Sequence, residues 1–199
     1  AAICAAVDIP VNVDAEHCFA DDEGGVARTV ELLAEAGASG VSLEDFDPVR
    51  GALVGMSEEV ELVGAAAEVA HRHGVTLTAR AENHLHGVQD VDDTIARLQA
   101  YRAAGADCLY APGPTDLTVI RRIVEEAGGP VNVIVLRGGP GVSELTELGV
   151  RRISTGGGMA WAAYGGLVAA ATELRDHGTT AYLATALPSS LRDEAFGTG

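Results

Sequence analysis

The stretch "EEVELVGAAAEVAHRHGVTLTARAE", residues 58–82, joins a helix-like segment to a strand-like one. Apolar residues recur every three or four positions up to residue 73, which predicts an amphipathic helix. Gly74 follows directly, at a place where a left-handed terminating residue is common. From residue 75 onward β-branched and small residues alternate with polar ones, which predicts a strand. A helix, a glycine and a strand therefore form the unit from which the fold is predicted.

The same unit recurs along the chain. Other segments rich in Ala, Leu and Glu end near glycine and lead into short strand-like runs, namely "VSLEDFD", "DCLYAPG", "PVNVIVLRGG" and "VRRISTGGG". An opening strand, "VNV" of residues 11–13, precedes them. The sequence therefore predicts strands in strict alternation with helices. Such alternation is typical of an α/β fold with a parallel sheet, either open and doubly wound or closed into a barrel.

Polar residues on the predicted strands favour the barrel. A doubly wound sheet is buried on both faces, so its strands are mostly continuous hydrophobic runs. Here polar residues alternate along the strands instead, and no G-x-G-x-x-G fingerprint follows the first strand. The alternating polar set is Asn12, Asp14, Glu16, Ser42, Glu44, Thr76, Thr78, Arg80 and Glu82. We therefore predict a (β/α)8 TIM-type barrel.

The predicted barrel is partial. A complete one needs eight strands and about 250 residues, whereas this sequence has 199 residues and six predicted strands. We expect about two βα units to be missing from the front. Residues 1–199, including the helices at the C-terminal end, are predicted to form a single partial barrel domain.

Composition narrows the class of function. The chain has 13 basic and 29 acidic residues, and its net charge of −16 argues against nucleic acid or an anionic membrane as a partner. It contains no lysine, so its own residues cannot form a Schiff base with a substrate or with pyridoxal phosphate. Three cysteines without a disulfide pattern, and no signal-peptide-like start, predict a cytoplasmic protein.

Three carboxylates are predicted to gather at the C-terminal ends of neighbouring strands. Asp14, Glu16 and Glu44 occupy these positions, and barrel enzymes place their chemistry at that end of the sheet. Oxygen ligands suit a hard cation, Mg²⁺ or Mn²⁺. The alternative is that they are solvated loop acids in a strongly acidic protein.

Arg80 supplies a positive charge at the same end of the sheet. A planar guanidinium there suits a substrate carboxylate. The alternative is a structural ion pair with Glu44 or Glu82. A different metal site, a zinc site made of His17, His84 and His86, is a further alternative.

Several blocks, taken in order and spacing, resemble one known family. The blocks are "PVNVDAEHCFADD", "GASGVSLEDFDP", "TARAENHLHG", "YRAAGADCLYAPGPTD", "GPVNVIV" and "LGVRRISTGGGMAWAAYG". They resemble the isocitrate lyase and phosphoenolpyruvate mutase superfamily over almost the whole chain. The resemblance implies a barrel whose Mg²⁺ site binds a 2-oxo acid and stabilises an enolate while a C–C or P–C bond breaks or forms.

The resemblance also implies roles for individual residues. Asp14 and Glu16 match the acidic pair of the family's third strand, Glu44 matches the acid of the fourth, and Arg80 matches the arginine of the fifth. We expect Asp14, Glu16 and Glu44 to bind the metal and Arg80 and Glu44 to act in catalysis. The residues expected to bind substrate are Arg80, Asn12 and Glu82.

Two loops depart from the family pattern. The loop "FDPVRGALVGMSEE" lacks the Lys-Lys/Arg-Cys-Gly-His motif of the lyase branch, so isocitrate or methylisocitrate cleavage by that motif is not expected. The usual Gly-Tyr-Gly is replaced by Cys18, Phe19 and Ala20. The hypothesis is a Mg²⁺-dependent lyase acting on a small 2-oxo or 2-hydroxy dicarboxylate. The alternatives are a phosphonopyruvate or phosphoenolpyruvate mutase or hydrolase and a non-catalytic relative that binds a small acid.

The C-terminal segments predict an oligomer. Members of the resembled family assemble through C-terminal helices, and "AAYGGLVAAATELRDHG" and "TTAYLATALPSSLRDEAF" offer such segments after the last strand. An exposed apolar helix is otherwise a liability for a protein in water. We expect a homodimer or homotetramer.

Overall fold

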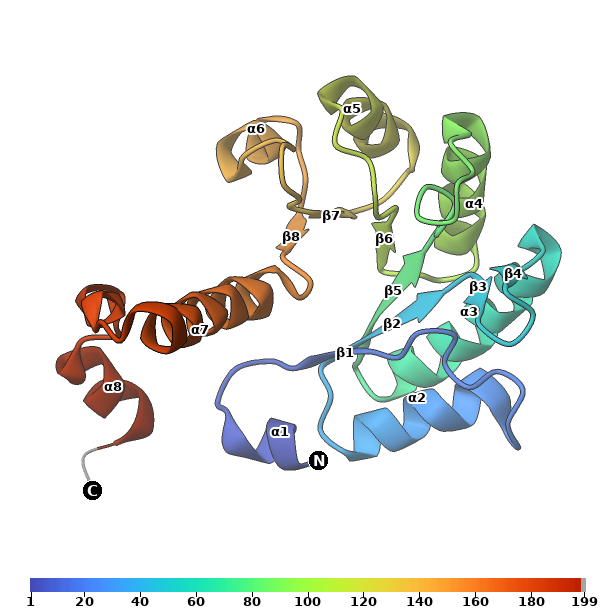
Figure 1. The fold of residues 1–199 in the computed structure, drawn as a ribbon. Coiled ribbons are helices and arrows are strands. Elements are labelled where there is room, and N and C mark those ends of the chain that lie inside the picture. The colour runs from blue at the N-terminus through green and yellow to red at the C-terminus, as the bar shows by residue number, and fades with distance from the viewer. Residues whose placement is uncertain (198–199) are drawn as a thin grey trace. The chain divides into compact units, whose positions relative to one another are not determined.

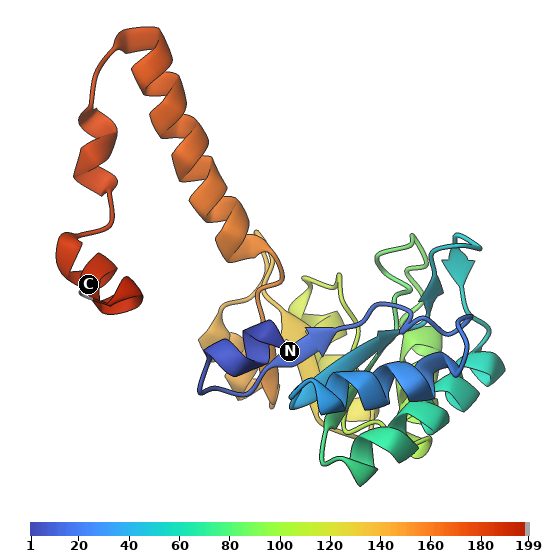
Figure 2. The ribbon, with the colours of Figure 1, turned by 90° about the horizontal axis from the view of Figure 1, so that it is seen from below.

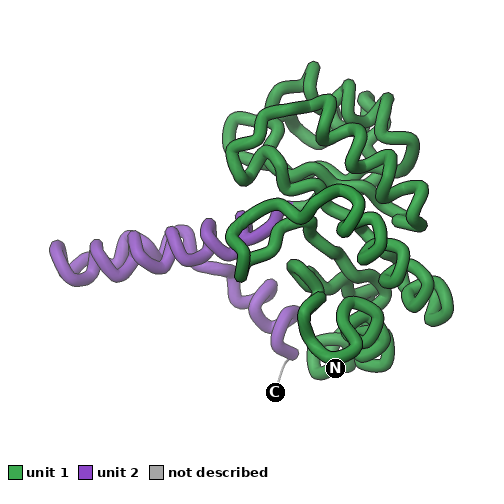
Figure 3. Tube along the Cα trace, turned by 90° about the vertical axis from the view of Figure 1, so that its right-hand side faces the viewer, with its two compact units in different colours: residues 1–154 green, residues 155–199 purple. Residues whose placement is uncertain are grey.

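The computed structural model describes residues 1–197. It separates into two compact units, residues 1–154 and the residues from 155 onward (Figure 3). Within residues 1–197, every helix is too short or too polar to cross a membrane.

The first unit contains a six-stranded, entirely parallel sheet that curls into an open half-barrel (Figure 1). In spatial order its strands are β1 (Asn12–Asp14), β2 (Gly40–Glu44), β5 (Thr76–Arg80), β6 (Cys108–Tyr110), β7 (Val131–Ile134) and β8 (Arg152–Ser154). The spatial order follows the order along the chain, as in a barrel rather than a doubly wound sheet. The predicted fold class, a partial TIM-type barrel, is confirmed.

Helices cover the convex side of this sheet (Figures 1 and 2). They are α2 (Gly25–Glu35), α3 (Met56–Arg72), α4 (Val91–Ala103), α5 (Leu117–Glu126) and α6 (Val142–Glu147), and the short α1 (Ala2–Ala6) precedes β1. Gly105, after α4, has a φ of +116°, and a Cβ there would lie 2.8 Å from the Cβ of Ala67 on α3. Both the backbone conformation and the close approach of α3 therefore require glycine.

The core lies between the sheet and these helices. Val41, Leu43 and Leu77 are fully buried and pack in one cluster with helix residues such as Val63 and Leu98. Successive side chains on a strand point to opposite faces. The apolar half of each strand thus faces the helices, which leaves the polar half on the concave side of the sheet. This alternation positions the site described below.

The sequence predicted a single strand over the run "VSLEDFD", and this prediction is wrong. β2 ends at Glu44, and the two-residue strands β3 (Phe46–Asp47) and β4 (Ala52–Leu53) form a separate antiparallel hairpin. The Asp47 carboxylate closes it, because Oδ1 accepts the backbone N–H groups of Val49 at 2.7 Å and Arg50 at 2.9 Å. This aspartate turn is a local alternative to continuing the strand.

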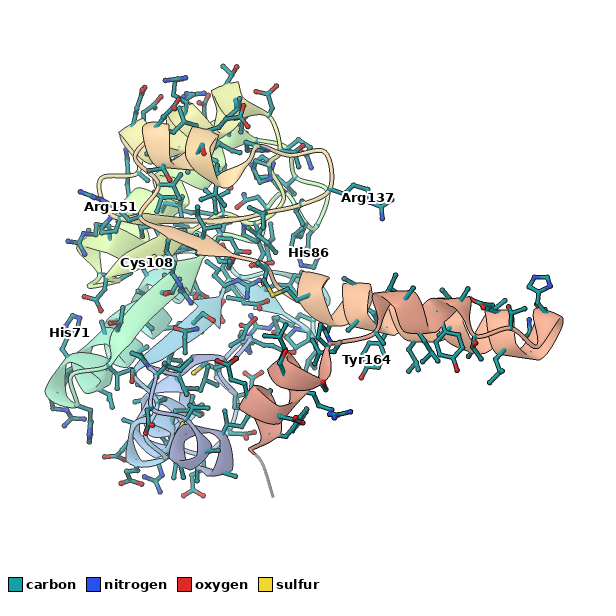
Figure 4. The ribbon with its side chains drawn as sticks, turned by 90° about the vertical axis from the view of Figure 1, so that its left-hand side faces the viewer. His71, His86, Cys108, Arg137, Arg151 and Tyr164 are labelled. Carbon is teal, nitrogen blue, oxygen red and sulfur yellow. The ribbon has the colours of Figure 1, made fainter. Side chains whose placement is uncertain are left out.

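The second unit consists of α7 (Gly158–His177), the 3-10 helix η1 (Ala181–Thr185) and α8 (Ser189–Phe196). The Glu173 carboxylate ties η1 to α7 by accepting the Thr179 hydroxyl at 2.6 Å and the Ala181 N–H at 2.7 Å. Large apolar side chains of α7 are exposed, and Figure 4 shows Tyr164 projecting from the helix. The exposed set is Met159, Trp161, Tyr164, Leu167, Val168 and Leu174.

Candidate functional site

Arg80, the last residue of β5, lies at the centre of a cluster of carboxylates. Its Nη1 donates to both Asp14 oxygens, at 3.0 and 2.9 Å, and lies 2.8 Å from Glu44 Oε1. Its Nε donates to Glu82 Oε1 at 2.8 Å. The guanidinium carbon lies 5.0 Å from the centre of the Tyr110 ring, and only 10% of the Arg80 side chain is exposed. These contacts fix the orientation of the guanidinium on the concave face.

Strand register explains why these groups meet. Glu44 of β2 is paired with Arg80 of β5, and Arg80 is paired with Tyr110 of β6. Asp14 of β1 is paired with Ser42, whose hydroxyl donates to Asp14 Oδ1 at 3.0 Å. Each of these residues except Ser42 ends its strand. The cluster therefore lies at the C-terminal edge of the parallel sheet, where barrel active sites form.

The cluster carries more negative than positive charge. Burial raises the pKa of Glu44 to about 7, against the opposing effect of Arg80, and the carboxylates of Glu82, Asp14 and Glu16 raise it further. Burial also raises the pKa of Glu82, although Arg80 again opposes the shift. One guanidinium cannot neutralise this many acids. A set of oxygen donors with surplus negative charge fits a hard divalent cation.

Glu16 and Asn12 are placed less directly than strand alternation implied. β1 ends at Asp14, and Glu16 lies in the following turn with a φ of +50°, so strand parity does not orient its side chain. Its backbone carbonyl accepts the Glu44 N–H at 2.9 Å, which holds the two residues together. Asn12 lies at the other end of β1, beside Gly40, and lines a cavity with Thr76. Their predicted metal and substrate roles stay predictions.

Behind the cluster, a buried ion-pair network anchors the end of β2. Asp45 is fully buried, and its carboxylate accepts the Tyr101 hydroxyl at 2.6 Å, Arg97 Nη1 at 2.9 Å and the Glu82 backbone N–H at 2.7 Å. Arg97 Nε also donates to Asp93 at 2.9 Å. This network joins β2, α4 and the residues after β5. It therefore positions Glu44 and Glu82 on either side of Arg80.

Sequence reasoning missed Tyr110 and Asp45. The same parity that selects Asp14 and Glu44 places Tyr110 on the concave face, because it pairs with Arg80. That signal was available in "DCLY". Asp45 had no such signal, because its partners Arg97 and Tyr101 follow 52 and 56 residues later.

The histidines of the zinc alternative do not gather in one place within residues 1–197. His86 stacks on Phe46, with ring centres 3.5 Å apart. His84 bonds Gln89 at 3.1 Å and Thr94 at 3.3 Å. Only His17 belongs to a group of metal-binding residue types whose ligand atoms lie close together, and its companions there are aspartates rather than histidines.

Comparison with known proteins places the chain in a family. Residues 1–175 match the family model described as phosphoenolpyruvate phosphomutase. The chain belongs to the phosphoenolpyruvate phosphomutase family. The predicted resemblance to the isocitrate lyase and phosphoenolpyruvate mutase superfamily is thereby confirmed.

Individual members of the family and superfamily are similar over most of the chain. An oxaloacetate decarboxylase of Bradyrhizobium sp. (strain BTAi1) is 34% identical over 155 residues, which are 74% of this chain and 52% of the relative. A structure from Burkholderia cenocepacia J2315, provisionally named a lyase/mutase, is 45% identical with a TM-score of 0.88, over 96% of this chain and 70% of that chain. A structure of 2,3-dimethylmalate lyase is 26% identical with a TM-score of 0.76, over 94% of this chain and 69% of that chain.

The chain spans about half the length of the curated relatives that it matches. Within that span lie all the carboxylates around Arg80 described above. What those relatives bind or convert is therefore carried over to this chain only as a proposal.

Proposed function

We propose that this member of the phosphoenolpyruvate phosphomutase family is a Mg²⁺-dependent carbon–carbon lyase acting on a small 2-oxo or 2-hydroxy dicarboxylate. The observation that carries the proposal is the cluster of acids around one buried guanidinium at the C-terminal edge of a parallel half-barrel. The relatives named oxaloacetate decarboxylase and 2,3-dimethylmalate lyase support a dicarboxylate substrate.

Arg80 binds the substrate and offsets developing charge. Its Nε is held by Glu82, and the Tyr110 ring lies against the guanidinium, so the group is oriented before substrate arrives. A preorganised cation costs little reorganisation when negative charge accumulates in the transition state. We assign to Arg80 the binding of the substrate carboxylate and the stabilisation of the negative charge on the enolate oxygen. Glu82 acts as its orienting partner, and Asn12, which strand alternation puts on the same face of β1 as Asp14, is the third residue assigned to substrate binding.

Asp14, Glu16 and Glu44 would hold the metal, directly or through water. When bound, Mg²⁺ supplies Lewis-acid polarisation of the 2-oxo group. Glu44 has a pKa raised to about 7, so without a cation it can hold a proton at neutral pH. A nearby divalent charge favours the ionised carboxylate. Metal binding is therefore expected to release a proton at neutral pH.

Phosphorus–carbon chemistry is the second candidate. The description of the matching family model favours it, and a guanidinium suits a phosphonate as well as a carboxylate. As mutase or hydrolase, the protein would use the same Arg80 cluster on phosphonopyruvate or phosphoenolpyruvate. The two candidates differ in substrate rather than in site.

A turnover screen tests the proposal. We expect Mg²⁺-dependent release of pyruvate or another 2-oxo acid from oxaloacetate or one of a panel of substituted malates, whereas release from phosphonopyruvate would favour the second candidate. EDTA and Glu44→Gln should each abolish the release, whereas Glu68→Gln, an exposed acid on α3, should not alter it. Failure of every substrate, with oxalate still bound, would favour the non-catalytic relative that binds a small acid.

We also propose a homo-oligomer, formed through the apolar side chains of α7. Trp161 is 73% exposed and Leu167 is 63% exposed, and large apolar side chains exposed together on one helix are a liability in water unless a partner covers them. Light scattering at micromolar concentration should give a dimer or tetramer, and Trp161→Glu should lower the mass. A monomeric parent would contradict the proposal.

Because all three cysteines carry free thiols, we place the protein in the reducing cytoplasm.

A further inference from the structure

A second group of metal-binding residue types lies outside the Arg80 cluster. One potential ligand atom from each of His17, Asp21 and Asp47 falls within 4.8 Å of the other two. His17 and Asp21 belong to the turn that follows β1, whereas Asp47 belongs to β3 of the separate hairpin. Two segments about 30 residues apart in sequence thus bring an imidazole and two carboxylates together.

Asp47 provides a second observation, because its buried Oδ2 has a half-exposed ion-pair partner but no hydrogen bond within residues 1–197. The residue is 1% exposed, and its Oδ2 accepts no hydrogen bond within the described part of the chain. Arg50 Nε lies 2.9 Å from Oδ2 but without hydrogen-bond geometry, and the Arg50 side chain is 55% exposed. A buried carboxylate oxygen normally accepts a hydrogen bond, so Oδ2 keeps a lone pair that a cation could use.

Space for a ligand adjoins the group. A cavity of about 260 Å³ lies beside it, and its lining includes His17 and Asp21 together with the apolar side chains of Phe19, Pro48 and Val49. A metal ion held by three protein ligands keeps open positions for water or another small ligand. The cavity is large enough for such a ligand.

We propose that His17, Asp21 and Asp47 Oδ2 form a second metal site, selective for a divalent transition metal such as Zn²⁺ or Co²⁺. An imidazole nitrogen among the ligands distinguishes this site from the all-oxygen set around Arg80, because imidazole suits transition metals whereas Mg²⁺ prefers oxygen. The chain would then hold two cation sites of different selectivity.

Arg50 is the competitor that a metal must displace from Asp47. Its Nη1 already makes contacts of 3.0 and 3.2 Å with the Glu58 carboxylate, which can retain the guanidinium when the metal takes its place beside Oδ2. Removing this positive charge should therefore strengthen metal binding. Arg50→Gln is expected to tighten Co²⁺ binding, which is the opposite sign to removal of a ligand.

Calorimetric titration of the whole chain with Co²⁺, with Zn²⁺ and with Mg²⁺ as separate probes tests the site. His17→Ala and Asp21→Asn should each weaken Co²⁺ binding by about tenfold or more. The matched controls are Glu23→Gln, an exposed acid near Asp21 that is not part of the cavity lining, and His84→Ala, whose ring bonds Gln89 and Thr94 instead. Both controls should bind Co²⁺ as the parent does.

The outcomes separate cleanly. If His17→Ala leaves Co²⁺ affinity unchanged, Co²⁺ is bound at the Arg80 cluster or as an adventitious ion only, and the proposed second site does not exist. If Arg50→Gln does not tighten binding, Asp47 is not a ligand and the assignment also fails. Glu44→Gln should weaken Mg²⁺ binding without altering Co²⁺ binding here. If the parent shows no Mg²⁺-dependent turnover but the Co²⁺ titrations give the expected results, the proposed activity is contradicted and the second metal site is supported.

Discussion

Asp45→Ala is expected to lower the free energy of unfolding by about 3–5 kcal/mol. Asp45 is fully buried, and its carboxylate neutralises Arg97, whose side chain is only 11% exposed. Alanine would leave Arg97 with Asp93 as its remaining ion-pair partner, and would leave the Tyr101 hydroxyl and the Glu82 N–H without their acceptor. Breaking a buried pair by removing one member is costly because the other charge stays buried.

Urea unfolding measures this effect, and Asp92→Ala is the control. Asp92 also pairs with an arginine, Arg122, but its side chain is 78% exposed. An exposed ion pair contributes about 0–1 kcal/mol, so the control should unfold close to the parent. If Asp45→Ala lowers the free energy of unfolding by as little as Asp92→Ala does, the network does not anchor β2.

Glu44→Gln is expected to lower Mg²⁺ affinity by roughly 10- to 100-fold, with loss of turnover, while the metal-free fold keeps its stability. Arg80 retains Asp14 and Glu82 as partners in this variant. Removing one of several crowded acids also relieves repulsion among them. Asp14→Asn should act in the same direction, because Asp14 is 61% exposed and Arg80 keeps Glu44 and Glu82.

The pH dependence of this variant follows from the raised pKa of Glu44. The folded protein keeps a proton on Glu44 up to about pH 7, whereas an unperturbed glutamate loses it near 4.5. This contribution to stability is therefore complete below the lower value and is lost as the pH rises through the higher one. Glutamine has no proton to lose. In EDTA, the melting temperature of Glu44→Gln relative to the parent should rise between about pH 5 and pH 8.

A structural role for the acids predicts a different result. If Glu44, whose side chain is 16% exposed, serves only to pair the buried Arg80, its neutralisation should lower the free energy of unfolding in EDTA. The parent should then also show no response to Mg²⁺. That combination would contradict the assignment of Asp14 and Glu44 to a metal.

Strand parity predicted the residues that meet on the concave face, because a parallel sheet in sequential order puts consecutive strand ends side by side. Asp14, Glu44 and Arg80 illustrate this, and Tyr110 follows the same rule. Parity fails at Glu16, where the backbone leaves the strand with a positive φ. Parity also cannot report that one guanidinium contacts three carboxylates at once, because side-chain conformation decides that.

Contacts between a strand end and a distant helix or loop could not be predicted from the sequence. Asp45 and Arg97 pair across 52 residues, and nothing in either local sequence identifies the other. The β3–β4 hairpin was hidden for another reason: "FD" continues the β-rich run of "VSLE", and the Asp47 turn that ends it depends on backbone geometry. The proximity of Asp47 to His17 follows from that hairpin and was equally unpredictable.

The most direct measurement is the melting temperature of the parent with Mg²⁺ and oxalate together, since oxalate resembles the enolate of a 2-oxo acid. A ligand that binds only the folded state stabilises it by about 2.7 kcal/mol at a hundred times its Kd. We predict a larger rise with both than with either alone, because in the proposed site oxalate binds to the metal as well as to Arg80. Glu44→Gln should abolish the rise and Glu68→Gln should retain it. No rise in the parent, or an equal rise in Glu44→Gln, would contradict the assignment of the Arg80 cluster to a metal-dependent 2-oxo acid site.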